Sequence, residues 1–228
     1  MTADNEKLNN PVWYSLSETH QSFSLGNDHI KFYHPDYCPF GGFILNENIS
    51  GCIEEYSMMA DSFFIVGERP QFSNSLKLKN ELVCEQMVLY EKIRMDIREN
   101  IVKLGDERAD DLFHLVNLVQ PGYFNRKTFL LGSYHGIFKN NDLVAVTGER
   151  MKMNGHTEVS AVVTHPDHTG KGYAKQLVAY TSNNIFDEDK IPYLHVAKNN
   201  TTAISLYEKL GFKRRRKISF WNLVKNNS

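Results

Sequence analysis

The chain has 228 residues, enough for one large domain or two small ones with a real hydrophobic core. Hydrophobic residues make up 41% and charged residues 23%, as in ordinary globular proteins, and the net charge of −1 gives no reason to expect a nucleic-acid partner. No apolar run approaches the roughly 18 residues that a membrane-spanning helix needs. The first residues are polar and unlike a signal peptide, so we expect a cytoplasmic protein.

Cysteine and histidine spacing argues against a metal site. Cys38, Cys52 and Cys84 are odd in number and form no Cys-x-x-Cys pair. This pattern favours a reducing compartment and gives no sign of a zinc site or a disulfide framework. His165 and His168 are close in sequence, but Pro166 breaks helical spacing between them and no third ligand is evident, so we expect a turn there.

The first 98 residues are mostly strand-forming. Asn10 and Pro11 predict the start of a short helix that runs to Leu16. Apolar, β-prone segments are interrupted by Gly, Pro and Asn, which predicts strands at residues 29–33, 40–46, 62–66 and 82–90. The highly charged residues 94–100 are expected to connect two halves of the chain.

From residue 101 the pattern is that of an α/β (α+β) protein. Apolar spacing predicts helices at 110–118, 172–185 and 201–210. Asn140-Asn141-Asp142 is a hairpin turn signal between two strands. The expected strands are 101–104, 134–138, 143–151, 157–164 and 193–197, with one or two closing strands over 212–223. This order predicts an antiparallel meander joined to a strand–helix–strand crossover.

A glycine-rich turn, Thr169-Gly170-Lys171-Gly172-Tyr173-Ala174, lies between a strand and a helix. Glycines let the backbone approach a phosphate and direct several N–H groups at it. The positive end of the helix dipole favours the same anion, and Lys171 could pair with it. Taken alone, a Gly-x-Gly is more often a plain turn.

A second motif follows about 25 residues later, with Asn200, Ala203, Tyr207 and then Gly211-Phe212. Together the two motifs resemble those of the GNAT superfamily of acyl-CoA-dependent N-acetyltransferases, whose signature loop is Gln/Arg-x-x-Gly-x-Gly/Ala. Gly172 and Ala174 match the signature, whereas Thr169 stands where Gln or Arg is usual. The resemblance covers roughly residues 101 to 220.

The resemblance implies a mixed central sheet with splayed parallel strands flanked by helices. It places the acetyltransferase domain at 99–228 and makes 1–98 an N-terminal extension that can be a degenerate second copy of the fold. Asn10–Trp13, with residues 121–124 and 148–150, resembles a bacterial-type branch with such an extension. The extension would close the acceptor side of the cleft, and the candidate apolar walls, most of them also candidate core residues, are Trp13, Phe32, Tyr33, Phe63 and Phe64.

The resemblance also implies acetyl-CoA as co-substrate and no metal. Strands 157–164 and 193–197 would splay, so that the pantetheine arm pairs with the backbone like an added strand. A backbone N–H, with that of Val163 as the candidate, would face the oxyanion. The cofactor-binding residues expected from the resemblance are Ala161, Val162, Val163, Thr164, Thr169, Gly170, Lys171, Gly172, Tyr173, Ala174, Asn200, Ala203 and Tyr207.

The implied reaction is direct attack of a neutral amine on the thioester in a ternary complex, with no covalent intermediate. Glu158 is the candidate base, directly or through water, with Glu149 and His156 as rivals. An equal alternative is that Glu158 simply faces solvent on an alternating strand. Tyr207 is the candidate acid for the leaving thiolate, and its alternative is a core aromatic on an amphipathic helix.

We expect the acceptor to be a small-molecule or amino-acid amine, with a protein or peptide amine as the second choice. A non-catalytic acyl-CoA-binding regulatory module is the alternative from another class. The basic run Lys213–Lys217 could suggest nucleic acid, but within a strand we expect alternating exposed faces and partial neutralisation of a CoA phosphate. The expected partners are therefore the amine acceptor, without nucleic acid or membrane, for a monomer or homodimer.

Overall fold

The computed structural model describes residues 3–226. Within that range the α-helices are α1 Pro11–Ser17, α2 Ser50–Ser57, α3 Ala109–Val119, α4 Tyr173–Asp187 and α5 Thr201–Lys209. The strands are β1 Ser24–Gly26, β2 Ile30–Tyr33, β3 Phe40–Phe43, β4 Ser62–Gly67, β5 Leu76–Val88, β6 Ile101–Leu104, β7 Tyr134–Lys139, β8 Asp142–Met153, β9 His156–Thr164, β10 Ile191–Ala197 and β11 Lys213–Lys225. No helix of this range is long and apolar enough to cross a membrane.

All the strands belong to one mixed sheet of order β1-β2-β3-β4-β11-β5-β10-β9-β8-β7-β6. Counted from either edge the order follows the same scheme, with one additional antiparallel strand in the C-terminal half. Each half begins with antiparallel strands and continues with a parallel pair joined by a helix, β3 and β4 through α2 or β9 and β10 through α4. Next to each pair lies the last strand of the other half. The N-terminal half thus repeats the strand scheme of the C-terminal half with one strand fewer, and the mixed sheet with flanking helices confirms the predicted fold class.

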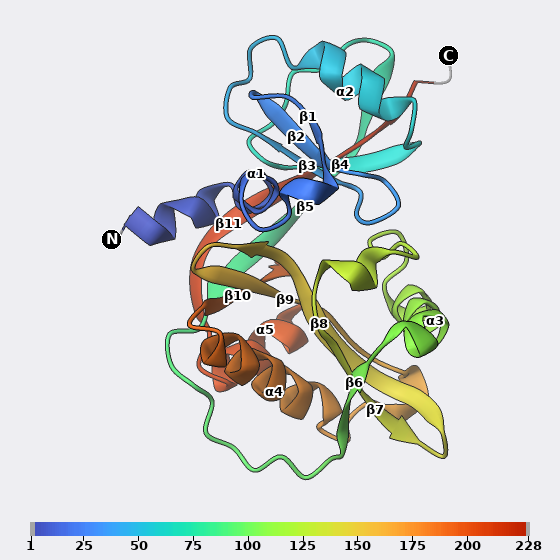
Figure 1. Ribbon diagram of the computed structural model, residues 1–228, viewed down its shortest axis with the longest axis vertical. Coiled ribbons are helices and arrows are strands. Elements are labelled where there is room, and N and C mark those ends of the chain that lie inside the picture. The colour runs from blue at the N-terminus through green and yellow to red at the C-terminus, as the bar shows by residue number, and fades with distance from the viewer. Residues whose placement is uncertain (1–2, 227–228) are drawn as a thin grey trace.

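The last strand of each half, β5 or β11, lies in the other half of the sheet, and these two exchanged strands join the halves. β5 pairs with β11 from Leu76↔Lys225 to Val88↔Lys213, and it also pairs with β10 on its other side. β11 pairs in turn with β4. Figure 1 shows β11 and β5 running from the lower part of the molecule, which contains α3, α4 and α5, into the upper part with α2. The sheet is continuous across them, and the proposed domain boundary at residue 98 stays a prediction.

Local signals explain most element boundaries. The Asn10 side chain accepts a hydrogen bond from Trp13 N (3.4 Å) and caps α1 as predicted. Asn140 and Asn141 both have positive φ, at 51° and 70°, as the hairpin between β7 and β8 requires. The helices expected at 110–118, 172–185 and 201–210 are confirmed within two residues.

Several N-terminal elements, including the short strand β1, differ from the prediction. β3 ends at Phe43 rather than at residue 46, and β5 begins at Leu76 rather than at residue 82. The early part of β5 is polar and mostly exposed, so it lacks the apolar pattern of a strand, but it is paired with β11. α2 was not predicted, because Gly51 lies in its first turn and its N-cap residue Ile49 makes no side-chain capping bond.

β9 and β10 separate soon after they meet. Their parallel pairing covers Ile191↔His156, Pro192↔Thr157 and Tyr193↔Glu158, and stops there. Ala161 has a φ of 50°, a left-handed conformation that an alanine adopts only at an energetic cost, within an irregular stretch of the pairing of β9 with β8. The bulge turns the second half of β9 away from β10, so the expected splay is present.

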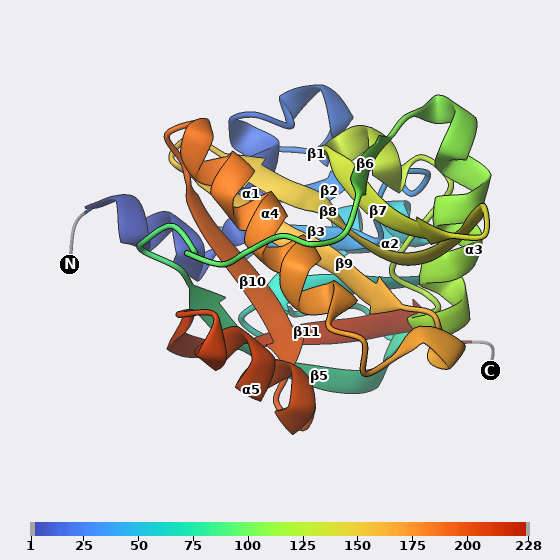
Figure 2. The same cartoon turned by 90° about the horizontal axis from the view of Figure 1, so that it is seen from below.

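The helices cover the sheet with apolar side chains. α4 packs against β8, β9 and β10 and buries Leu177, Val178 and Ile185 completely. α3 packs against β8 and β9 and buries Leu112 and Leu115 in a separate cluster. Figure 2 shows α4 lying across the strands and α3 to one side of it. The two helices therefore contribute to separate apolar clusters over β8 and β9.

His135 predicts a pH dependence of stability. Burial lowers its pKa to about 4, and its Nδ1 has no hydrogen-bond partner among the described residues. Between pH 6.5 and 4 the histidine is protonated in the unfolded chain but stays neutral in the folded chain. The free energy of unfolding therefore falls as the pH falls, by at most about 1.4 kcal/mol per pH unit for one group. His135→Phe should retain packing on Tyr180 and flatten the slope in urea denaturation across this range. His114→Phe, at an exposed position, is the control; an unchanged slope in His135→Phe would contradict the assignment.

Candidate active site

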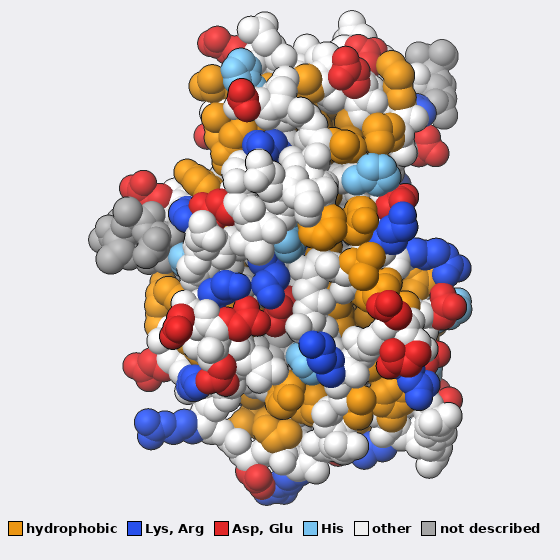
Figure 3. Space-filling model, viewed as in Figure 1, with side chains coloured by type: hydrophobic (Ala, Val, Ile, Leu, Met, Phe, Trp, Pro, Cys, Tyr) orange, Lys and Arg blue, Asp and Glu red, His pale blue; other side chains and the backbone are white. Residues whose placement is uncertain are grey.

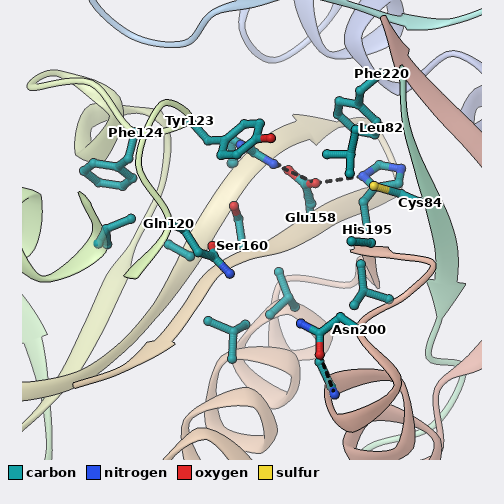
Figure 4. A pocket seen from close by; sticks show the side chains of 18 of the residues that line it. Leu82, Cys84, Gln120, Tyr123, Phe124, Glu158, Ser160, His195, Asn200 and Phe220 are labelled. Atoms are coloured by element: carbon teal, nitrogen blue, oxygen red, sulfur yellow. Dashed lines mark hydrogen bonds and ion pairs between the residues drawn. The ribbon is translucent and has the colours of Figure 1, made fainter. Parts of the chain in front are cut away.

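A cavity of about 430 Å³ lies where β9 and β10 separate. Both halves of the chain contribute to its walls, and Figure 4 shows their side chains converging on it. The C-terminal half supplies parts of β8, β9, β10 and α5, together with the end of α3 and the loop after it. It also supplies Phe220 of β11, and the N-terminal half supplies residues of β3 and β5. The lining residues are Phe40, Leu82, Cys84, Val116, Val119, Gln120, Pro121, Tyr123, Phe124, Arg150, Glu158, Val159, Ser160, Ala161, Val162, His195, Val196, Ala197, Asn200, Ala203, Tyr207 and Phe220.

The cavity has two chemically different ends. In Figure 4, Asn200 lies at one end, whereas Leu82, Cys84 and Phe220 lie at the other with Glu158 close by. The Asn200 end is formed by the start of α5, where the Asn200 side chain accepts from Ala203 N (3.1 Å). The opposite end is mostly apolar and comes largely from β3, β5 and β11. We call these the α5 end and the apolar end.

Glu158 is held by a dense set of donors at the apolar end. Arg150 Nε donates to its Oε2 (2.9 Å) and Arg150 Nη2 donates to its Oε1 (3.1 Å). His195 Nδ1 lies 2.8 Å from Oε1, and Met151 N lies 3.5 Å from Oε2. A carboxylate has about four lone-pair positions, so these contacts use nearly all of its capacity to accept hydrogen bonds.

Glu158 is ionised despite its burial. Only 1% of its side chain is exposed, and burial by itself would raise its pKa. The Arg150 guanidinium, followed by the His195 hydrogen bond, outweighs this effect and lowers the pKa of Glu158 to about 2. The alternative that Glu158 faces solvent is therefore wrong. As a base it would be weak, because so acidic a group has little tendency to keep a proton.

His195 links this ion pair to the exchanged strand β5. Gln86 Nε2 donates to Leu8 O (2.8 Å) and lies 3.1 Å from His195 Nε2, while Gln86 Oε1 accepts from Arg215 Nη1 (2.9 Å). With Gln86 as donor, Nε2 of His195 is an acceptor and Nδ1–H donates to Glu158. One polar residue from each of five neighbouring strands, β11, β5, β10, β9 and β8, thus forms a continuous chain.

The glycine-rich turn is shaped to accept an anion. Gly170 and Gly172 have φ values of 76° and 77°, and a Cβ at either position would meet open space. Gly172 is the N-cap of α4 and supplies no side-chain cap, so the first N–H groups of this 15-residue helix lack that partner. Thr169 donates from Oγ1 to Pro166 O (3.1 Å) and thereby closes the turn. These features fit the phosphates of a coenzyme A.

The structure brings only some of the predicted site residues into the cavity. Glu158, Ala161, Val162, Asn200, Ala203 and Tyr207 line it. Val163 is instead buried in the core beneath α3, and neither Thr164 nor the turn Thr169–Ala174 is part of the lining. The rivals of Glu158 as base lie elsewhere: Glu149 pairs with Lys152 (2.7 Å), and His156 is fully buried beside Tyr193.

The apolar walls were predicted at the wrong positions. Trp13, Phe32, Tyr33, Phe63 and Phe64 do not line the cavity. Four of them are buried in two hydrophobic clusters instead, in agreement with the alternative that most of them are core residues. The first 98 residues supply Phe40, Leu82 and Cys84 instead.

The polar partners Arg150, His195 and Gln86 were also missed. The sequence does contain a signal for Arg150. Asn154-Gly155 is a hairpin dipeptide, which brings positions near 150 opposite those near 158. The pairing of His195 with Gln86 joins residues 109 positions apart and has no local signal.

The basic run on β11 is largely engaged within the chain. Arg214 Nε pairs with Glu208 (2.8 Å), and Arg216 Nη1 donates to Asn9 (3.0 Å). Arg215 is the extra residue at a bulge against β5 and reaches Gln86. Figure 3 shows acidic and basic side chains interspersed on the face that it presents, rather than a field of one sign.

The Arg150–Glu158 pair predicts a large loss of stability when one partner is removed. Glu158→Gln leaves the buried Arg150 guanidinium uncompensated, which should lower the free energy of unfolding by about 3–5 kcal/mol. In Arg150→Met/Glu158→Gln neither charge remains, so the loss should be smaller than in Glu158→Gln. Urea denaturation of the three proteins tests this; a double variant less stable than Glu158→Gln would contradict it.

Comparisons with known proteins agree with this arrangement. The model of the FR47-like protein family matches residues 134–221. A GNAT-family protein from Novosphingobium aromaticivorans superimposes with a TM-score of 0.89 and 27% identity, covering 96% of this chain and 99% of that one. A tandem GNAT protein from the clavulanic acid biosynthesis pathway shares the fold, with a TM-score of 0.55, 11% identity and coverage of 87% and 79%. The UPF0157 protein YqkA of Bacillus subtilis is 32% identical over 81 residues, 36% of this chain and only 23% of that protein. The match over residues 134–221 and the likeness of the whole chain to a GNAT-family protein both support the GNAT superfamily, whose fold supports acyl transfer in general.

Proposed function

We propose that the protein transfers the acetyl group of acetyl-CoA to a primary amine of a small molecule. The observation that carries this proposal is the separation of β9 from β10 after Tyr193↔Glu158, which opens a cavity containing Tyr207. The second half of β9 leads through a short 3-10 helix, Pro166–His168, to the glycine-rich turn at the start of α4. A cleft beside a strand that leads to a phosphate site suits a thioester on a long phosphorylated arm.

The backbone of β9 provides the cofactor's hydrogen bonds in this proposal. His165 N donates to Val144 O on β8 (2.8 Å). Successive N–H groups along a strand point in opposite directions. By this alternation the Val163 N–H points towards β8, while those of Val162 and Thr164 point towards the gap. We therefore assign the oxyanion donor to Val162 rather than Val163.

Beyond the cavity, at the start of α4, the N–H groups of Thr169–Ala174 would bind the pyrophosphate. Asn200 and Ala203 would line the other side of the arm, since both lie on the cavity wall at the start of α5. Acetyl-CoA supplies the reactive thioester when bound.

We assign to water the role of accepting the proton that the amine must lose. Glu158 has its lone pairs filled and its pKa lowered to about 2, which disfavours the direct form of the predicted base role. Its more suitable role is that of a fixed anion that positions Arg150 and His195. Burial raises the pKa of Tyr207, so its hydroxyl stays protonated and can donate to the departing thiolate.

The glycine-rich turn predicts how binding should respond to substitution. Wild-type protein should bind one equivalent of acetyl-CoA in calorimetric titration, with CoA and desulfo-CoA for comparison. Gly170→Val/Gly172→Val should weaken binding at least about tenfold, because both backbones are strained and the phosphate approach is blocked. Gly155→Val is the matched control, at a glycine with a φ of 83° and open space around it in the turn before β9. Failure of the wild-type protein to bind acetyl-CoA would refute the proposal.

Tyr207 predicts a selective loss of turnover. Tyr207→Phe should lower kcat by about 10² or more and leave acetyl-CoA affinity unchanged, since only the proton donor is removed. Thiol release with an amine acceptor measures kcat. Tyr180→Phe, on α4 and outside the cavity lining, should retain full activity. Full turnover in Tyr207→Phe would remove the acid assignment, and binding without any turnover in the wild type would favour a regulatory module.

A further inference from the structure

We infer that the amine acceptor is an apolar monoamine, with its amine on a ring-bearing or branched hydrocarbon body and no second charge. This inference rests on the acetyl transfer proposed above. It follows from three features of the cavity. The walls of the apolar end are hydrocarbon and aromatic rings, every charged lining residue is already in an ion pair, and neutral polar groups lie between the two ends.

The apolar end is walled by rings and hydrocarbon. Phe40 and Phe220 lie edge to face with centroids 5.4 Å apart, and both are nearly fully buried. Leu82 and Tyr123 are half-buried and complete the wall together with Cys84. Burial raises the pKa of the Cys84 thiol to about 12, so this group is neutral. Such a surface gains most free energy by covering another apolar surface.

The charged residues of the cavity wall form an ion pair with each other. Among the residues that line the cavity, Arg150 and Glu158 carry full charges, and they form a two-bond ion pair. Glu158 also accepts from His195, whose other ring nitrogen faces Gln86. The guanidinium of Arg150 lies over the Phe40 ring, 4.6 Å from its centroid. A second cation on the substrate would find no free anion here and would be buried unpaired.

An amino acid is disfavoured for a related reason. Its carboxylate could only be matched by Arg150, and an approach to Arg150 is also an approach to the Glu158 carboxylate. Two buried carboxylates at one guanidinium repel each other. The decarboxylated amine with the same side chain avoids this repulsion.

The amine itself has neutral partners available. Ser160 and Gln120 lie between the apolar end and the α5 end in Figure 4. Both carry oxygens that can accept from an amine without demanding a net charge. A single amine placed there would be directed towards the part of the cavity assigned to the thioester, with the hydrocarbon body behind it.

The test compares five acceptors by thiol release at saturating acetyl-CoA: 2-phenylethylamine, isobutylamine, phenylalanine, spermidine and a lysine peptide. We expect kcat/KM for 2-phenylethylamine to exceed that for phenylalanine and for spermidine at least about tenfold, with isobutylamine also ahead of both. A preference for phenylalanine or spermidine would overturn the inference, as would a lysine peptide that outperforms both apolar amines. Binding of acetyl-CoA without turnover of either apolar amine would also overturn it. Absence of acetyl-CoA binding would instead be a failure of the proposed function.

A gain of charge gives an independent check. Leu82→Glu adds an anion to the half-buried edge of the apolar end, so the ratio of kcat/KM for 2-phenylethylamine to that for spermidine should fall at least about tenfold. Leu78→Glu is the matched control, because Leu78 is half-buried on the same strand but packs in the N-terminal core. An unchanged ratio in a folded Leu82→Glu protein would show that the acceptor does not enter this end.

Discussion

The early end of the pairing between β9 and β10 is the constraint on which the rest of the site depends. Parallel strands normally continue their hydrogen bonds to the end of the shorter strand, but here pairing stops at Tyr193↔Glu158. The left-handed residue Ala161 and the bulge around it turn β9 aside. Its backbone groups beyond that point face a cavity instead of a neighbouring strand. Unpaired backbone in a sheltered groove must find other partners, and an extended ligand can provide them.

The exchanged strands explain how the N-terminal half takes part in this site without a phosphate loop of its own. β5 lies between β10 and β11, so Leu82, Cys84 and Gln86 reach the cavity or its polar chain. The corresponding parallel pair of the N-terminal half, β3 and β4, is joined by α2 through residues 44–49, which contain no glycine-rich turn. The N-terminal half thus has the same strand scheme as the C-terminal half, and it forms part of the wall of a single site.

The sequence allowed the C-terminal half to be predicted closely, because its signals are local. Asn140-Asn141 marks a hairpin, Gly172 and Gly211 mark helix ends, and apolar periodicity marks α3, α4 and α5. The N-terminal half was predicted less well, because β5 begins with a polar segment and α2 lacks a capping signal. The polar chain through Gln86 and His195 could not be predicted, since its members meet only after the exchange of strands.

Hydrogen–deuterium exchange with and without acetyl-CoA is the measurement that tests the central claim most directly. If β9 and the start of α4 hold the cofactor, exchange should slow at residues 161–164 and 172–175 when acetyl-CoA is added. Residues 62–67 of β4, which line no part of the cavity, should exchange as before. Slowed exchange at β4 with no change along β9 would contradict the account.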